Sequence, residues 1–296
     1  MFKLAMTTGI GLFASIYVHA QLDKFYTIKP SPDFDTVDFY LKATATNCLL
    51  QLDTEDKNPL TIYGNPNLDK INPSFASKVR NKVCYARLKL DEYNSSGFGD
   101  SFTMAVSGND KENDFWKVNL NSSKIYRLNL IYGFGNADVN LTGTSVDKLK
   151  IKSGSADIII GYDDGNYNPV QMDTFFIKAD FGSIVANRME LSRAKNVITK
   201  IGFGNVLLDF DQNNREKCNI YASVGAGNLE ILLPRKNTPV IIYIKDSPLC
   251  AMKMADDFEE VEKNVFVNMN YSASADNLLT FNVDVALGMV RFKYAD

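Results

Sequence analysis

A glycine followed by apolar residues at alternate positions recurs six times along this chain, and this repeat limits the fold more than any other feature. A second alternating stretch precedes each glycine, so one copy reads as strand, glycine, strand. Alternation places one face of a strand in a core and the other in solvent. The alternation shifts by one residue at the glycine, which indicates a sharp bend or a positive φ there. The six glycines are Gly135, Gly154, Gly182, Gly204, Gly227 and Gly288.

The spacing of these copies predicts a β-solenoid, in which each rung buries its apolar face only against its neighbours. The first four intervals between the glycines are 19, 28, 22 and 23 residues, and the last is 61 residues. The long interval indicates an insertion at about residues 249–276. We therefore expect an all-β fold, a single stack with two strands per rung and glycine corners. In this register the residue before each glycine, such as Phe181 or Phe203, faces the core.

The insertion contains apolar residues at helical spacing with acidic residues between them, which predicts one short amphipathic helix before the last rung. The apolar positions are Met254, Phe258, Val261 and Val265. Such a helix would cover an apolar row or an end of the stack. A regulatory lid is the alternative.

Residues 21–124 fit the repeat loosely and are interpreted as strands and loops that close the stack, whereas residues 125–296 carry the repeated rungs. Segment 38–52 aligns with the rungs if Thr46 takes the glycine position. Residues 57–79 are rich in Asn, Pro and Lys and are interpreted as loop with one helical turn.

Residues 1–20 have the pattern of a signal peptide: Lys3 near the start, an apolar run, and a small residue, Ala20, before the expected cleavage site. An uncleaved anchor is the alternative, but the apolar run is short and interrupted by polar residues. No later segment is long and apolar enough to span a membrane. We therefore expect an exported protein without a transmembrane segment after cleavage.

Cleavage would remove the only histidine, His19. A chain without histidine cannot build a Ser-His-Asp, Cys-His or His-metal site, so catalysis of those kinds is excluded. Removing Lys3 leaves a net charge near −4, one unit below the −3 of the full chain. This mildly acidic balance argues against nucleic acid as a partner.

Four cysteines, Cys48, Cys84, Cys218 and Cys250, allow three disulfide pairings. In an oxidising compartment the simplest is one bond within each half, Cys48–Cys84 and Cys218–Cys250. Buried free thiols are the other interpretation, because Cys48 lies at an inward position of an alternating run. No CxxC is present, so neither a redox dithiol nor a zinc ribbon is indicated.

The acidic segment Asp209, Asp211 and Asn213 has the spacing of the start of a calcium loop. It lacks the turn glycine and the bidentate glutamate of a complete loop, so a solvated turn between rungs is the preferred interpretation. We expect no metal and no cofactor.

Asp138 and Asp157 are predicted to lie in the same outward column on consecutive rungs. Two carboxylates at a suitable separation could serve a glycosidase. Two neighbouring acids on a solvated face are the ordinary explanation, since the column shows no cleft.

An apolar patch is predicted on the outward face after the corners. Val185 and Leu207 share the column of the two aspartates, and Ile159 and Leu232 lie in the next column. Such patches are covered by another segment or bind a partner. Cover by the predicted helix and an open interface both remain possible.

Residues 116–234 resemble the bacterial toastrack fold, found in adhesins of the head-GIN type and in cell-envelope stress proteins. The segments that carry the resemblance are 126–135, 149–154, 207–210 and 225–234, of which the last is the clearest. Such families are exported or membrane-anchored. Two features depart from the family: no transmembrane segment follows the signal, and Arg188 takes an inward position in its rung. The resemblance supplies no functional residues.

Together these features predict a bacterial, exported, non-catalytic protein of the periplasm, cell envelope or outer surface. It would act as an adhesin-like module that binds an unidentified surface, glycan or envelope-protein partner. A carbohydrate-active β-helix enzyme that uses paired Asp residues is the alternative.

Overall fold

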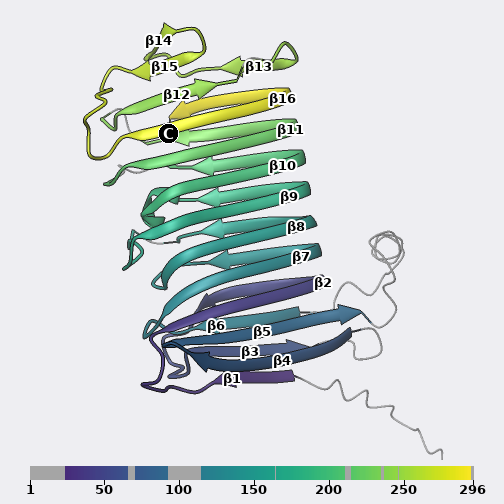
Figure 1. The fold of residues 1–296 in the computed structure, drawn as a ribbon. Helices are drawn as coiled ribbons and strands as arrows, with labels where there is room; N and C mark the ends of the chain where they lie inside the picture. The colour runs from purple at the N-terminus through teal and green to yellow at the C-terminus, as the bar shows by residue number, and fades with distance from the viewer. Residues whose placement is uncertain are drawn as a thin grey trace, which may run out of the picture.

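The computed structural model describes residues 24–65, 71–92, 115–163, 165–210, 215–234, 237–245 and 247–294. These residues form an elongated stack of strands that belong to one 16-stranded sheet (Figure 1). The predicted all-β, solenoid-like fold is thereby confirmed. No helix among the described residues is long and apolar enough to cross a membrane. The expected signal peptide lies outside the described residues.

The elements have the following bounds. In chain order they are β1 (Lys24–Ile28), β2 (Thr36–Leu52), β3 (Leu60–Asn65), β4 (Ile71–Arg80), β5 (Val83–Glu92), β6 (Phe115–Leu120), β7 (Ile125–Asn140), β8 (Ser145–Gly161), β9 (Met172–Asn187), the 3₁₀ helix η1 (Met189–Ser192), β10 (Ala194–Asp209), β11 (Cys218–Leu233), β12 (Val240–Ile244), β13 (Cys250–Lys253), β14 (Phe258–Glu262), β15 (Val265–Asn268) and β16 (Leu279–Tyr294).

Seven long strands form the stack, in the order β2, β7, β8, β9, β10, β11, β16, and each pairs with the next in parallel. Each strand bends near its middle, so that it has a first arm before the bend and a second arm after it. The bends lie along one edge of the stack and the turns between rungs along the other (Figure 1). Every rung therefore contributes one strand segment to each of two facing layers.

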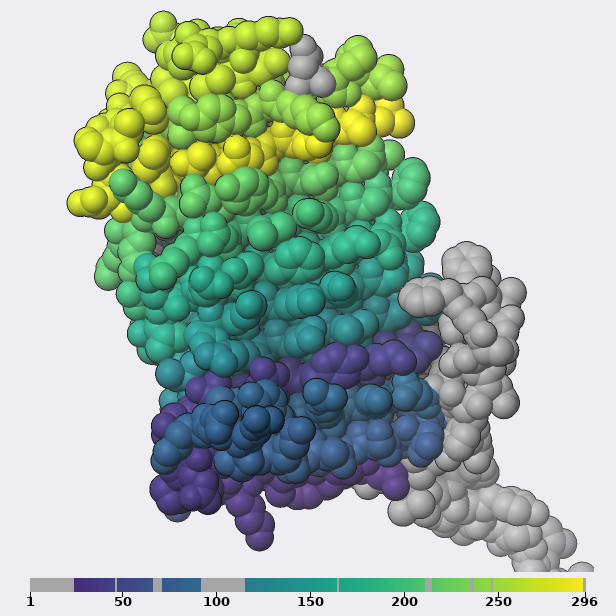
Figure 2. Space-filling view, viewed as in Figure 1, coloured from purple at the N-terminus to yellow at the C-terminus, as the bar shows by residue number. Residues whose placement is uncertain are grey.

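The core lies between the two layers. Alternate residues of both arms are buried, as in the first arm of β9 (Phe175, Ile177) and in its second arm (Ile184). Phe281 in a first arm packs edge-on against Phe292 in a second arm, with ring centroids 5.7 Å apart. In space-filling view the rungs form closely packed successive bands (Figure 2). Burial of β-branched and aromatic side chains against neighbouring rungs therefore stabilises the stack.

Both ends of the stack are closed in the same way. At the N-terminal end, β5 pairs with the first arm of β2 and β6 with its second arm. At the C-terminal end, β12 and β13 pair with the two arms of β16. Antiparallel strands then extend each end: β4 on β5, β3 and β1 beyond β6, and β14 and β15 beyond β12.

Two of the outermost strands carry residues that discourage pairing with another chain. Pro73 interrupts the donors of β4, and three glutamates lie in β14. Proline and charge on an edge strand are common means of preventing edge-to-edge aggregation.

The amphipathic helix predicted within residues 249–276 is wrong. This segment forms β13 and the β14–β15 hairpin, which turns at Asn264 with a φ of 63°. Val261, which the helix would have buried, is 52% exposed. Pairing of β15 with β12 at the end of the sheet outweighs the local helical pattern. The loop predicted over residues 57–79 is also wrong, because β3 and β4 occupy most of it.

Candidate binding surface

The bends of the long strands fall in one column of paired backbone positions, here called the corner column. Gly135, Gly182, Gly204, Gly227 and Gly288 lie in it, and their φ values are between 109° and 144°. A Cβ on Gly227 would lie 1.7 Å from the carbonyl oxygen of Gly204. Thr46 pairs with Gly135, so its predicted corner position is confirmed.

Gly154 does not lie in the corner column, and this prediction is corrected. Ala156 pairs with Gly135 and takes the corner position of β8, where it is fully buried. Its N–H donates to the hydroxyl of Ser153 at 2.7 Å. Glycines also occur two residues before the corner, at Gly133 among other positions, and Gly154 belongs with these. In β8 only that earlier position is glycine.

In β9, β10 and β16 the residue before the corner points to solvent, which corrects the inward assignment. Phe181, Phe203 and Leu287 are 53%, 58% and 50% exposed. The rings of Phe181 and Phe203 are stacked, with centroids 5.4 Å apart and an interplanar angle of 10°. The alternation would bury these side chains in a straight strand. At a bend the position lies on the outside of the turn, and an apolar column results along the corner edge.

A polar column follows directly after the corner. Asn136 donates to Asn47 at 3.0 Å and Asn228 donates to Asn205 at 2.9 Å, side chain to side chain. In the same column Asp157 accepts from the backbone N–H of Ser183 at 2.9 Å. Because equivalent backbone positions are one strand spacing apart, neighbouring asparagines reach each other, and Asp157 and Ser183 separate the two asparagine pairs.

Ile159, Val185 and Leu207 form a third column two residues further along the second arms. Ile159 is 50% exposed, so no described segment covers it. Ile159 was predicted in the next column and in fact shares that of Val185 and Leu207. Leu232 lies in the next column, beside Asp209. The predicted patch is therefore one continuous column of three apolar residues, Ile159, Val185 and Leu207, with Leu232 in the next column.

These three columns lie side by side and are here called the corner-edge surface. Its residues include Phe181, Phe203, Leu287, Asn136, Asp157, Ser183, Asn205, Asn228, Ile159, Val185 and Leu207.

Asp138 and Asp157 do not share a column, which corrects the predicted carboxylate pair. Asp138 pairs with Ile159, whereas Asp157 pairs with Asn136. The spacing was misread because Gly154 was taken as the corner of β8. The two acids thus belong to different columns of the second-arm face.

No group of three or more His, Cys, Asp or Glu residues that could hold a metal ion occurs within the described part of the chain. Of the weak calcium candidate, Asp209 ends β10 and is half-buried. Asp211 and Asn213 lie outside the described residues.

All four cysteines are free, and Cys48, Cys84 and Cys218 are buried. The register separates both predicted pairs. Cys84 pairs with Val37, nine residues before the bend of β2 at Thr46, whereas Cys48 lies two residues after that bend. Cys218 pairs with Leu279 at the start of β16, and Cys250 pairs with Gly288 at its corner. Nine residues of strand span roughly 30 Å, far beyond the Cα separation of a disulfide. The alternative of free thiols is the one that the structure contains.

Thiol titration should count these free cysteines. Burial raises the pKa of Cys48 and Cys218 to about 12, so their thiolates are scarce at neutral pH. In native protein at pH 8 we expect only the partly exposed Cys250 to react with Ellman's reagent within minutes. Four thiols should react after denaturation without reductant. If only two thiols or none react after denaturation, disulfides have formed.

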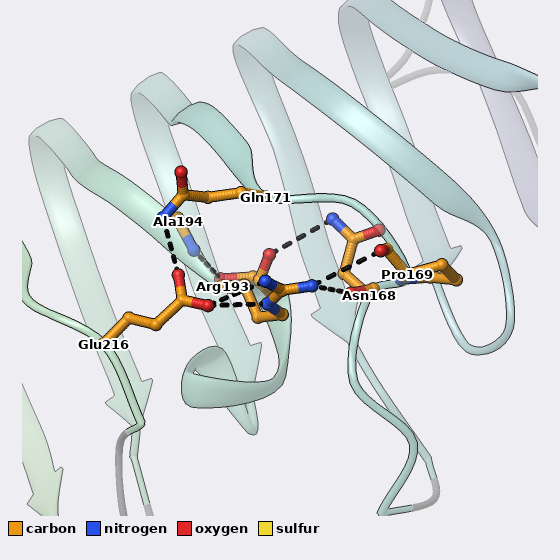
Figure 3. Close-up of polar contacts among 7 residues, drawn as sticks. Asn168, Pro169, Gln171, Arg193, Ala194 and Glu216 are labelled. Atoms are coloured by element: carbon orange, nitrogen blue, oxygen red, sulfur yellow. Dashed lines mark hydrogen bonds and ion pairs between the residues drawn. The ribbon is translucent and has the colours of Figure 1, made fainter. Parts of the chain in front are cut away.

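On the turn edge, Arg193 connects three successive rungs (Figure 3). Its guanidinium donates to Glu216 at 2.7 and 2.9 Å and to the carbonyls of Asn168 and Pro169 at 3.3 Å. Gln171 donates to the other carboxylate oxygen of Glu216 at 2.6 Å. Arg193 has a left-handed φ of 53° at the end of η1. This network fixes the irregular turns and has no access to a described pocket, so we assign it a structural role.

Glu216→Gln should lower stability at neutral pH by about 1 kcal/mol, the scale of a partly exposed charged hydrogen bond. Partial burial alone raises the pKa of Glu216, but hydrogen bonds from Arg193 and Gln171 and nearby positive charges bring it below its ordinary value of 4.5. Because the pKa of Glu216 is lower in the folded state than in the unfolded state, its ionised carboxylate stabilises the fold at pH values above the ordinary pKa of 4.5. That stabilisation is lost as the pH falls through the folded-state pKa.

The difference in unfolding free energy between wild type and this variant should therefore close in acid. Urea titrations at pH 7, 4 and 2.5 measure it. Asp91→Asn is the matched control, because the Lys42–Asp91 pair is nearly half exposed on both sides and contributes little. A difference that persists unchanged at pH 2.5 would contradict the assignment.

Comparison with known proteins gives structural similarity only. No family model matches the chain, and no curated protein matches it. The chain is similar to a "putative cell adhesion protein" from Clostridium sporogenes, with a TM-score of 0.46, 14% identity and coverage of 93% of this chain and 99% of that chain. A "putative adhesin" from Bacteroides fragilis has a TM-score of 0.43, 13% identity and coverage of 92% and 96%. A "putative lipid binding protein" from Parabacteroides distasonis has a TM-score of 0.35, 11% identity and coverage of 92% and 96%.

Proposed function

We propose that this chain is an exported, non-catalytic protein of the bacterial cell envelope or surface that binds a protein partner, in the manner of an adhesin. The observation that carries the proposal is the corner-edge surface, where Phe181 and Phe203 stack on each other while more than half exposed. Contact of contiguous apolar side chains with water on an exposed face is unfavourable, and a bound partner would remove it.

The composition of the surface supports a protein as the partner. Binding energy at protein interfaces concentrates in a few apolar and aromatic anchors, and charged residues are depleted at the centre. The stacked phenylalanines and the apolar column from Ile159 to Leu207 have this character, and the asparagine pairs between them supply hydrogen-bonding groups. Asp157 lies in the asparagine column, and Asp138 and Glu230 lie at the two ends of the apolar column. Apolar anchors beside a few polar and charged groups suit another protein surface.

The rigidity of the rungs supports binding as well. In-register pairing on both sides holds the backbone of β9 and β10, so the positions from which the side chains of the surface project are fixed before a partner arrives. A surface that is already ordered loses less conformational entropy on association. The corner-edge surface is thus preorganised along the stack.

The support for a non-catalytic role comes from the acids and from the sequence. The two carboxylates of the alternative enzyme, Asp138 and Asp157, lie on an open face in neighbouring columns, and the backbone N–H of Ser183 already donates to Asp157. With the expected signal peptide removed, the chain would also lack its only histidine. Export itself rests on the pattern of residues 1–20. We propose no cofactor.

Binding to envelopes tests the function. Beads coated with the chain from Gln21 onward are mixed with intact cells and envelope fractions of the bacterium that encodes it. We expect wild-type beads to bind and Phe181→Ser/Phe203→Ser beads to lose at least nine-tenths of the binding. Protease treatment of the envelopes should abolish binding, because the partner is a protein.

The control variant is Val79→Ser/Val261→Ser, which removes two exposed apolar side chains from the edge strands β4 and β14. It should bind like wild type, and all variants should retain the wild-type melting temperature within about 2 °C. Wild-type beads that fail to bind, or phenylalanine variants that bind fully, would overturn the proposal. Glycan cleavage that disappears in Asp138→Asn/Asp157→Asn would favour the enzyme instead.

A further inference from the structure

The outer face of the first arms carries a local excess of positive charge. Seven basic side chains and two acidic ones occupy its three outward columns across β2, β7 to β11 and β16, although the whole chain has a net charge of −3. Three of the basic side chains are paired with acids beside these columns, Asp91, Asp147 and Asp180. The basic residues are Lys42, Arg127, Lys148, Lys150, Lys152, Lys178 and Lys200, and the acids are Asp38 and Asp284. This face is distinct from the corner-edge surface, which lies at the bend and on the second arms.

Three of these lysines form a row on consecutive strands. Lys152, Lys178 and Lys200 pair in register on β8, β9 and β10, so their backbones are about 4.8 Å apart. Lys178 bonds Asp180 on its own strand at 2.8 Å. Lys152 and Lys200 make no ion pair within the described residues. Like charges at this spacing repel one another, and an anionic chain laid along the row would relieve the repulsion.

The lysine row leads into a depression of about 510 Å³. Tyr221 and Tyr243 stand on either side of it, in register with Asn282 between them, and are 46% and 42% exposed. Two strand spacings separate the tyrosines, roughly 10 Å between backbones. Lys200, Ser223, Asp284 and Lys245 line the side toward the corner, and Lys245 bonds Asp284 at 2.8 Å.

This arrangement has the chemistry of a site for a sugar ring. Two aromatic rings with a gap between them can pack against the C–H faces of a ring, since both are apolar and flat. The amide of Asn282, the hydroxyl of Ser223 and the carboxylate of Asp284 offer donors and acceptors for sugar hydroxyls. A few polar groups beside an apolar wall are the usual composition of a small-molecule pocket.

We propose that the first-arm face binds an acidic polysaccharide. One sugar ring lies between Tyr221 and Tyr243, and carboxylate or sulfate groups on the following residues lie along Lys200, Lys178 and Lys152. Asp284 in the depression disfavours a phosphodiester at that place, whereas it accepts hydroxyl hydrogen bonds from a sugar. The inference goes beyond the proposed protein partner and does not depend on it.

The experiment measures binding of the chain from Gln21 onward to four probes: alginate and heparin oligosaccharides, neutral dextran, and single-stranded oligothymidine. Isothermal calorimetry at 50 and 300 mM NaCl gives the affinities. We expect alginate or heparin to bind at 50 mM NaCl and at least 10-fold more weakly at 300 mM. Dextran should not bind, and oligothymidine should bind at least 10-fold more weakly than the preferred polysaccharide.

Two variants separate the charge from the ring contact. Lys152→Gln/Lys178→Gln/Lys200→Gln and Tyr221→Ala/Tyr243→Ala should each weaken polysaccharide binding at least 10-fold. Lys117→Gln/Lys253→Gln/Lys293→Gln, with the same loss of charge on the second-arm side, should change it less than 3-fold. Circular dichroism verifies that each variant is folded.

Three outcomes would overturn the proposal: neither acidic polysaccharide binds, the second-arm lysine variant loses as much affinity as the first-arm variant, or oligothymidine binds as tightly and its binding survives the tyrosine substitutions. Because Phe181 and Phe203 are intact in these variants, their envelope binding should be unchanged. Failure here is therefore distinguishable from failure of the protein-binding function.

Discussion

Gly204→Val should lower the melting temperature by about 10 °C or more, the largest effect expected of any single substitution considered. Gly204 has a φ of 143°, which a β-branched residue does not tolerate. A Cβ there would lie 1.8 Å from the carbonyl oxygen of Gly182 on the preceding rung. That oxygen is backbone, so the clash is relieved only by separating the rungs, at a cost of about 4 kcal/mol or more.

Gly165→Val is the matched control, because a Cβ at Gly165 meets nothing within 4 Å. Its melting temperature should stay within about 2 °C of wild type. At this chain length about 2–4 °C corresponds to 1 kcal/mol, so thermal melts resolve the two variants easily. Equal shifts for Gly204→Val and Gly165→Val would contradict the register of the corner column.

Phe281→Ala should cost about 3–5 kcal/mol. Phe281 is fully buried between the layers and packs edge-on against Phe210 and Phe292, with centroids 5.6 and 5.7 Å away. Removing its ring leaves a cavity that the paired strands cannot close without breaking the sheet. Urea unfolding of wild type and variant measures the loss.

The position of this loss should be visible along the stack, because a rung contacts only its neighbours. Hydrogen exchange should quicken in β11, β12 and β16 and stay unchanged in β8. Thr280→Ala, a substitution on the outward side of the same strand, serves as the control and should lower the free energy of unfolding by less than about 1 kcal/mol. Uniform acceleration from β2 to β16 would show that the stack unfolds as one unit.

The repeat itself could be predicted from the sequence because each rung must bury alternate residues, and five of the long strands bend at a glycine of positive φ. Gly154 shows the limit of that reasoning. Several bends have the sequence Gly-X-Gly, and only the second glycine adopts a positive φ. In β8 only one of these two positions is a glycine, and spacing alone does not show whether it is the first or the second. The error moved Asp157 by one column and created the apparent pair with Asp138.

The exposed phenylalanines were missed for a related reason. Alternation assigns Phe181 and Phe203 to the core, and only the geometry of the bend shows that the last position before it faces outward. The β14–β15 hairpin was missed because its acidic and apolar residues also match a helix, and pairing with β12 is a long-range interaction. The basic first-arm face was hidden because a net charge averages over both faces, whereas the strand register separates them.

Oxidative footprinting of the chain bound to envelopes tests most directly whether the corner-edge surface holds the partner. Hydroxyl radicals modify exposed phenylalanine and methionine side chains, and mass spectrometry locates the modification. On binding we expect oxidation of Phe181 and Phe203 to fall at least 5-fold. Phe25 in β1 and Met269 in the turn after β15, which are 54% and 77% exposed, should remain as reactive as in the free chain. Unchanged oxidation of Phe181 and Phe203 in the bound protein would contradict the proposed function.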